Sequence, residues 1–372
     1  MGTITQSIAN NLTTGLGGAS GINFRNIIIN GDMNIAQRGT STASITTDGY
    51  YTVDRFNFEI GGSSVWTQSQ ASDAPSGQGF TYSLKMDCTT AQASPASNDI
   101  ILVGQSVEGF NLQTIKQGTS NAQSTTLSFW HKHTKTGTNI VELLDADNSN
   151  AVSGSYTQSV SDTWEKATIA FPANTSGTYG NDSNRSLRIR FIMGAGSDYT
   201  SGTLATTWQT TVTDANRYVG QVNNADNTAN NFSITGVQYE VGTTASDFEF
   251  LPVDVNLRRC QRYYQLIADG NGKSFCLAVA ARTTSYVDLV YPCTVPMRTQ
   301  PTLDVVSGTD YYYFYGLNSG YDKITAPSIG STYISGTTLV TGFYNGGSYT
   351  TGDSLIASTD NVNSYIALTS EL

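Results

Sequence analysis

The chain has 372 residues, only 13% of them charged, with a formal net charge of −10 and a pI of about 4.6. Its length favours two domains over a single core, and its acidic balance argues against a nucleic-acid-binding protein, which needs a basic face. Because no apolar run reaches about 18 residues, we expect no membrane insertion.

The first 23 residues are small and polar, and glycines recur from Gly15 to Gly21. Such a segment has too few apolar side chains to support a core. Two interpretations stay open: a leader without fixed structure, or an arm that becomes ordered when it docks to another protein. We predict that residues 1–23 form an N-terminal arm that binds another component of a larger assembly.

Residues 24–250 follow the period-two pattern of β-strands. The clearest case is Leu187, Ile189 and Phe191, which alternate with Arg188 and Arg190. Clusters of Gly and Asn separate this run from its neighbours. Strands with one buried face, repeated in one long region, predict two antiparallel sheets packed against each other.

A helical pattern follows in residues 251–267. Apolar side chains recur there at spacings of 4, 3, 4 and 3, and Pro252 fits a helix start. We therefore predict a helical connector over 251–267. A helix this short must pack on a domain or on copies of itself, and both possibilities stay open. The candidate chain-alignment stripe is Val253, Leu257, Cys260, Tyr264 and Ile267.

Residues 268–372 return to β patterns with frequent glycine turns, which predicts a second, smaller β-sandwich. The run from Tyr311 to Tyr315 reads YYYFY and places aromatic rings on both faces of a strand. Exposed tyrosines can stack on sugar rings, but tyrosine is also enriched in subunit interfaces. The candidate glycan or interface contacts are Tyr311, Tyr313, Tyr315 and Tyr321.

The short motifs that resemble catalytic or metal-binding sites are weak signals. Residues 352–355 read GDSL, as in a hydrolase nucleophile block, but no histidine follows to serve as a base. His131 and His133 share one strand face, yet no third metal ligand can be named from the sequence. We predict no catalytic residue, no cofactor and no enzymatic activity.

Several motifs fall in the order found in jelly-roll proteins of bacteriophage fibres and appendages. The sequence is similar to theirs at NIIINGDMNIAQRG (26–39), YTVDRF (51–56), LSFWHK (127–132), WEKATIAF (164–171), GVQYEVG (236–242) and CQRYY (260–264). The resemblance covers about residues 26–266, with a weaker echo at YP (291–292) through PMRTQPT (296–302). Phe56 and Tyr239 depart from the family pattern. We expect structural roles for Arg38, Asp54 and Arg55: an ion pair between the last two, and bonds from Arg38 to loop carbonyls.

The resemblance implies an all-β chain. Its parts are a jelly-roll β-sandwich similar to carbohydrate-binding modules over 24–250, a short helix, and the smaller sandwich over 268–372. It also implies a homotrimeric virion protein whose arm binds other virion proteins. The first hypothesis is a tail fibre or spike subunit that binds a glycan or protein on the host surface. The second is a capsid decoration or head-fibre protein, and the third is a polysaccharide depolymerase, for which no stacked repeat is visible.

Overall fold

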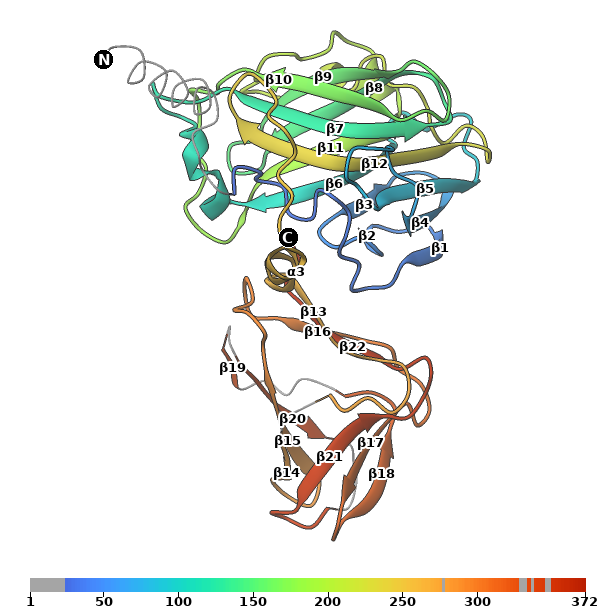
Figure 1. Ribbon diagram of the computed structural model, residues 1–372, viewed down its shortest axis with the longest axis vertical. Coiled ribbons are helices and arrows are strands. Elements are labelled where there is room, and N and C mark those ends of the chain that lie inside the picture. Colours follow the sequence, from blue (N-terminus) through green and yellow to red (C-terminus); the bar gives the residue numbers. More distant parts are fainter. Residues whose placement is uncertain (1–23, 276–277, 328–332, 336–337, 345–348) are drawn as a thin grey trace, which may run out of the picture. The chain divides into compact units, whose positions relative to one another are not determined.

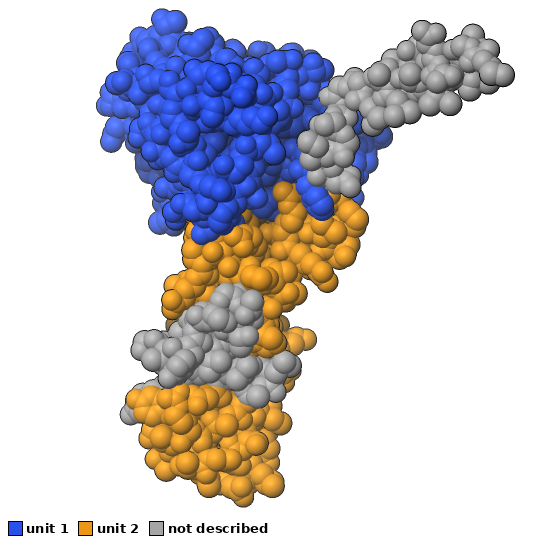
Figure 2. Space-filling view, turned by 90° about the vertical axis from the view of Figure 1, so that its left-hand side faces the viewer, with its two compact units in different colours: residues 1–32, 43–48, 58–250 blue, residues 33–42, 49–57, 251–372 orange. Residues whose placement is uncertain are grey.

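The structure is a computed structural model that describes residues 24–275, 278–327, 333–335, 338–344 and 349–372 (Figure 1). The N-terminal arm expected over residues 1–23 lies outside the described residues. The chain divides into two compact units, coloured separately in Figure 2. The first comprises residues up to 32, 43–48 and 58–250, and the second comprises 33–42, 49–57 and 251–372.

Two six-stranded antiparallel sheets form the larger β-sandwich (Figure 1). In sheet order, one contains β1 (Ser41–Ile45), β4 (Val65–Ala71), β5 (Ser83–Thr90), β12 (Asn231–Val241), β7 (Thr125–His133) and β10 (Glu165–Phe171). The other contains β2 (Gly49–Tyr50), β3 (Asn57–Ile60), β6 (Ile100–Glu108), β11 (Arg185–Ala195), β8 (Gly137–Asp145) and β9 (Asn150–Gln158). Because consecutive strands repeatedly change sheet, the order is that of a jelly roll.

Aromatic rings from both sheets meet in the core of this sandwich. The ring of Phe129 on β7 lies 5.0 Å from that of Phe191 on β11 and 4.9 Å from that of Tyr156 on β9, edge to face in both cases. Phe58 on β3 and Trp66 on β4 make a third contact across the sheets, at 6.2 Å. Edge-to-face packing at these distances is favourable beyond the area that it buries.

Strand β11 confirms the alternation expected from the sequence. Leu187, Ile189 and Phe191 are fully buried, while Arg188 and Arg190 point to the other face and bind carboxylates there. The all-β fold class and the jelly-roll sandwich are therefore confirmed.

The helical elements of the described residues are few and short. They are η1 (Gly109–Ile115), α2 (Ser197–Thr200), η2 (Asp214–Asn216) and α3 (Val253–Gln261). None of the helices in the described ranges is long and apolar enough to cross a membrane.

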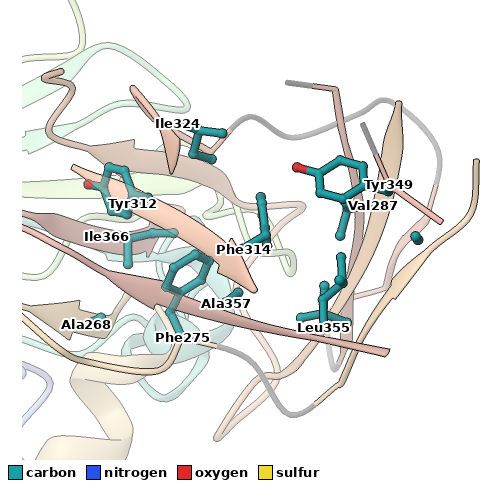
Figure 3. Close-up of a cluster of buried hydrophobic side chains, with 12 residues drawn as sticks. Ala268, Phe275, Val287, Tyr312, Phe314, Ile324, Tyr349, Leu355, Ala357 and Ile366 are labelled. Carbon is teal, nitrogen blue, oxygen red and sulfur yellow. The ribbon is translucent and has the colours of Figure 1, made fainter. Parts of the chain in front are cut away.

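The second unit contains a three-stranded and a seven-stranded antiparallel sheet. The first has the order β13 (Tyr264–Asp269), β22 (Tyr365–Thr369), β16 (Thr302–Val305). The second has the order β18 (Gly320–Ile324), β17 (Tyr312–Gly316), β21 (Ser354–Thr359), β14 (Ala278–Ala281), β15 (Tyr286–Pro292), β20 (Thr338–Tyr344), β19 (Tyr333–Ser335). Their shared core includes Ile366 of β22 and Phe275, Tyr312 and Phe314 (Figure 3). The second, smaller β-sandwich is thus present.

The helix expected over 251–267 is shorter than predicted. Helix α3 ends at Gln261, and Tyr264 begins β13, which pairs with β22 through Tyr264 and Thr369. Consecutive tyrosines, Tyr263 and Tyr264, are both buried. Tyr263 lies in the turn that follows the helix, where its amide bonds the Cys260 carbonyl, and the chain becomes extended at Tyr264, so the two neighbouring rings are buried in different directions, which one helical stripe does not allow. Burial of these rings therefore outweighs the helical spacing.

Candidate carbohydrate-binding face

The β17–β18 hairpin sorts its aromatic side chains by strand alternation. Tyr312 and Phe314 are fully buried and belong to the core of the second unit, where Figure 3 shows both in the same cluster of side chains. Tyr313 and Tyr315 occupy the intervening positions on β17, so they face away from that core. The antiparallel register places Tyr321 of β18 directly opposite Tyr315.

Three tyrosine rings therefore gather on the outer face of the seven-stranded sheet. The ring centroid of Tyr321 lies 4.6 Å from that of Tyr315 and 5.3 Å from that of Tyr313. Tyr321 is 68% exposed, and Ile356, which the register places opposite Tyr315 on β21, is 54% exposed. We name Tyr313, Tyr315, Tyr321 and Ile356 the outer tyrosine face. It offers a contiguous apolar surface with phenolic hydroxyls at its edge.

Tyr311, the fourth candidate contact, does not join this group. It precedes β17, is only partly exposed, and packs against the core cluster of the second unit. Its backbone carbonyl accepts hydrogen bonds from the Ser364 hydroxyl and the Asp360 amide. The structure thus gives Tyr311 a packing role and brings the other three candidates together.

The turn of the hairpin is held by Asp353 from the GDSL segment. Its carboxylate accepts a 2.8 Å hydrogen bond from the Ser319 hydroxyl and bonds of 3.2 Å and 3.0 Å from the amides of Asn318 and Ser319. The Ser319 hydroxyl is the largest cause that holds the pKa of Asp353 below its usual range. In this arrangement the carboxylate fixes a turn rather than orienting a base.

The chain-alignment stripe is not assembled as one surface. Val253 at the start of α3 is 67% exposed and Leu257 is partly buried, whereas Cys260 is fully buried. Tyr264 and Ile267 lie in β13 and not on the helix. Five residues that would share one helical seam are therefore distributed between an exposed helix face and the packed interior of the second unit.

Three of the matched motifs, 26–39, 51–56 and 260–264, contribute side chains to one cluster in the second unit. The Arg38 guanidinium lies 3.5 Å from the centre of the Tyr264 ring, and the Arg55 guanidinium lies 3.5 Å from the centre of the Tyr263 ring. Glu371 forms ion pairs with both arginines, at 3.2 Å to Arg38. We name Arg38, Arg55, Tyr263, Tyr264 and Glu371 the arginine–tyrosine cluster. Stacked guanidinium groups paired with a carboxylate hold three separate chain segments together.

We expected Asp54 to pair with Arg55, but beside this cluster Asp54 lies near Arg38, and Arg55 pairs with Glu371. The carboxylate of Asp54 accepts a 2.9 Å hydrogen bond from the Gln37 amide and lies 3.9 Å from an Arg38 nitrogen. Burial raises the pKa of Asp54 to about 6, against the opposing effects of Arg38 and Gln37. Arg38 thus pairs with the side-chain carboxylates of Asp54 and Glu371, and not with the loop carbonyls that we expected. No sequence pattern singled out Glu371, because its partners lie hundreds of residues away.

The two histidines lie in the core of the first unit. His131 Nδ1 is 2.8 Å from Gln158 Oε1, and His133 stacks on Phe232 at 3.9 Å while its Nε2 lies 3.1 Å from the Tyr156 hydroxyl. Burial lowers the pKa of both rings, and the neighbouring charge of His131 lowers that of His133 further. Among the described residues, no group of three or more His, Cys, Asp or Glu side chains is arranged to hold a metal ion.

Comparisons with known proteins give only distant structural similarity. No family model matches the chain, and no curated protein sequence matches it. Among solved structures, the enzymatically active domain of tailspike protein 4 from bacteriophage CBA120 is 16% identical over 59% of this chain and 22% of that chain, with a TM-score of 0.32. The chain thus spans about a fifth of that tailspike structure.

Two carbohydrate-binding modules are similar over more of their own length. A family 4 module is 11% identical over 57% of this chain and 98% of the other, with a TM-score of 0.28. The family 11 module from Clostridium thermocellum, solved with a mixed-linked tetrasaccharide, is 11% identical over 56% and 99%, with a TM-score of 0.29. At these identities and TM-scores, the similarities do not establish a shared ligand.

Proposed function

We propose that the chain is a bacteriophage virion protein, a tail fibre or spike subunit that binds host-surface glycan without catalysis. The observation that carries the binding half of this proposal is the outer tyrosine face. The rings of Tyr313 and Tyr315 lie 5.3 Å and 4.6 Å from that of Tyr321, on a paired β-hairpin whose turn Asp353 fixes. A preorganised aromatic surface binds a sugar ring with little loss of conformational entropy.

A face of this size supports weak binding of one sugar ring per copy. Stacking buries the apolar face of a saccharide against tyrosine, and we expect each ring to contribute about 1–2 kcal/mol. Several copies joined in one particle raise the avidity without any new contact. A homotrimer, three times the 39.8 kDa chain mass, would present three such faces.

The virion half of the proposal is supported by what the family-like motifs do. Arg38, Arg55, Tyr263 and Tyr264 come from three of the matched motifs, and all four lie in the arginine–tyrosine cluster. Their stacking and ion pairs give these residues a role in the architecture. In this proposal the cluster supports the architecture of a structural component, which docks to other virion proteins through residues 1–23.

The binding site is tested by substitution in the full chain. Tyr321→Ala and Tyr313→Ala should each weaken retention on immobilised host-envelope polysaccharide by about 5- to 30-fold, the equivalent of 1–2 kcal/mol. The control is Phe110→Ala, which removes a 52% exposed ring from the first unit. Equal retention of all three variants and the unsubstituted protein would contradict the assignment of this face.

The alternatives differ in place and in chemistry. Gold labelling of intact particles with an antibody to the chain should mark the tail. Labelling of the capsomers would support the decoration or head-fibre protein. Release of new reducing ends from the same polysaccharide, abolished by one Asp or Glu substitution, would replace binding by depolymerase activity. Size-exclusion chromatography with light scattering tests the trimer.

A further inference from the structure

The first unit contains a polar pocket that is separate from the outer tyrosine face and that no sequence motif indicated. It is a pocket of about 640 Å³ on the face of the second jelly-roll sheet that β8 and β11 turn away from the core. Its lining includes four arginines, which are Arg185, Arg188, Arg190 and Arg217, and the polar side chains of Thr211 and Asp214. The volume falls within the range usual for small-molecule sites.

Four arginines in one pocket are unusual for this protein, which has 19 lysines and arginines in total and a net charge of −10. Three of the four, Arg185, Arg188 and Arg190, belong to β11. Strand alternation directs Arg188 and Arg190 away from the core, and Arg217 joins them from the segment after η2. The concentration of guanidinium groups follows from the fold and not from the overall composition.

Three carboxylates pair with the inner guanidinium groups: Glu142, Glu59 and Asp214, which is 62% exposed and lies 3.1 Å from Arg217 Nη1. Glu142 on β8 is fully buried and lies 3.2 Å from Arg190 Nη1 and 2.6 Å from Arg217 Nε. Arg217 Nη2 and the Tyr218 hydroxyl also donate hydrogen bonds to Glu142, at 2.9 Å and 3.1 Å. Glu59 pairs with Arg188 and lies 3.6 Å from Arg190. These pairs preorganise the back of the pocket, as a built anion site requires.

The pocket keeps cationic capacity beyond these pairs. Arg185 is exposed at its rim and has no side-chain partner among the described residues. Arg190 is only 8% exposed, and its Nε has no hydrogen-bond partner. The carboxylate of Asp145 accepts hydrogen bonds from Asn148 and Gln117, which use its acceptor capacity within the protein. An anion that enters the pocket therefore meets guanidinium donors, while the nearby carboxylate of Asp145 is already hydrogen-bonded within the protein.

We propose that this pocket binds a saccharide unit that carries an oxyanion, either a carboxylate or a phosphate ester. The oxyanion is bound by Arg185 and Arg188, whose planar donors suit both groups. Sugar hydroxyls bind the hydroxyl groups of Thr210 and Thr211 and the carboxylate of Asp214. A polyanion such as nucleic acid fits poorly, because Asp214 and the net charge of the chain repel it.

The inference stands apart from the proposed function. The pocket lies in the first unit and requires neither a virion role nor the outer tyrosine face of the second unit. Loss of the tyrosines would leave it intact, and loss of Arg185 would leave the outer tyrosine face intact. The two sites can therefore be tested in the same protein with separate variants.

The experiment measures binding of simple probes to the full chain by isothermal titration at low salt. The probes are glucuronate, glucose 6-phosphate, glucose and inorganic phosphate. Glucuronate or glucose 6-phosphate, or both, should bind at least tenfold more tightly than glucose and than inorganic phosphate. The comparison between the two charged sugars shows which oxyanion the pocket prefers. Binding of the preferred sugar should weaken as salt rises, because part of it is electrostatic.

Substitutions assign that binding to the pocket. Arg185→Gln should weaken it about tenfold, since a hydrogen bond to a charged group is lost. Thr211→Ala, at an exposed position, should weaken it severalfold without a change of charge. Arg258→Gln removes the same charge from the exposed surface of α3 and should have no effect.

Three outcomes would overturn the inference. The first is that neither charged sugar binds, and the second is that glucose or inorganic phosphate binds as tightly as the preferred charged sugar. The third is that Arg185→Gln and Arg258→Gln behave alike. Tyr321→Ala, which tests the proposed function, should bind the charged sugars normally.

Discussion

Removal of one charge from the arginine–tyrosine cluster should destabilise the second unit strongly. Glu371→Gln keeps the shape of the side chain but removes the carboxylate shared by Arg38 and Arg55, whose side chains are only 8% and 1% exposed. Breaking a buried pair from one side leaves an uncompensated charge, which costs about 3–5 kcal/mol. With a urea dependence of about 2 kcal/mol per molar, the unfolding midpoint should fall by about 1.5–2.5 M.

The two units can be followed separately during this measurement. All four tryptophans, Trp66, Trp130, Trp164 and Trp208, belong to the first unit. Tryptophan fluorescence therefore reports the first unit, and hydrogen exchange of β13 and β22 peptides reports the second. We expect Glu371→Gln to shift the exchange transition and to leave the fluorescence transition in place.

A matched variant separates the cluster from ordinary surface charge. Asp288→Asn removes the carboxylate from the exposed ion pair with Arg282, and such pairs contribute about 0–1 kcal/mol. Its midpoint should stay within a few tenths of a molar of the unsubstituted protein. If Glu371→Gln shifts the exchange transition no more than Asp288→Asn, the cluster does not stabilise the second unit.

Three further predictions concern the first unit, with tryptophan fluorescence as the measurement. Folding lowers the pKa values of His131 and His133, so the folded state favours their neutral forms, which predominate above the unfolded pKa of about 6.5. Stability should therefore fall as the pH drops from 7.5 to 5. A melting temperature that does not change with pH would contradict this. Phe129→Ala should cost about 3–5 kcal/mol, because the ring packs from β7 onto Tyr156 and Phe191 of the opposite sheet, and a loss below 1 kcal/mol would contradict that role. Gly236→Ala should destabilise by at least about 1 kcal/mol, because φ is +61° and the new methyl would lie 2.6 Å from the Phe80 ring; an unchanged melting temperature would refute it.

Local pattern was enough to predict the strands with the clearest alternation. Alternation on β11 identified which side chains face the core, and the same rule separates Tyr313 and Tyr315 from Tyr312 and Phe314. It does not place Tyr311, which precedes the strand and is positioned by its contacts with Ser364 and Asp360. Periodicity applies only inside an element and says nothing about the residue just before it.

The helix and the cluster show where local pattern fails. The spacing from Val253 to Ile267 fits a helix, but β13 gains pairing with β22 and burial of Tyr263 and Tyr264. Neither gain is visible within a window of fifteen residues. Glu371 pairs with Arg38 across 333 positions of sequence, so only the folded chain brings the two charges together.

The composition of the second unit from three chain segments has a consequence for synthesis and for protein engineering. Residues 33–42 and 49–57 leave the ribosome long before Glu371, so Arg38 and Arg55 must wait for their carboxylate until nearly the whole unit has been translated. A fragment that begins at residue 251 would lack both guanidinium groups and would leave the faces of Tyr263 and Tyr264 uncovered. An expression plan for this unit should therefore keep the early segments, either in the full chain or joined to the fragment by a linker.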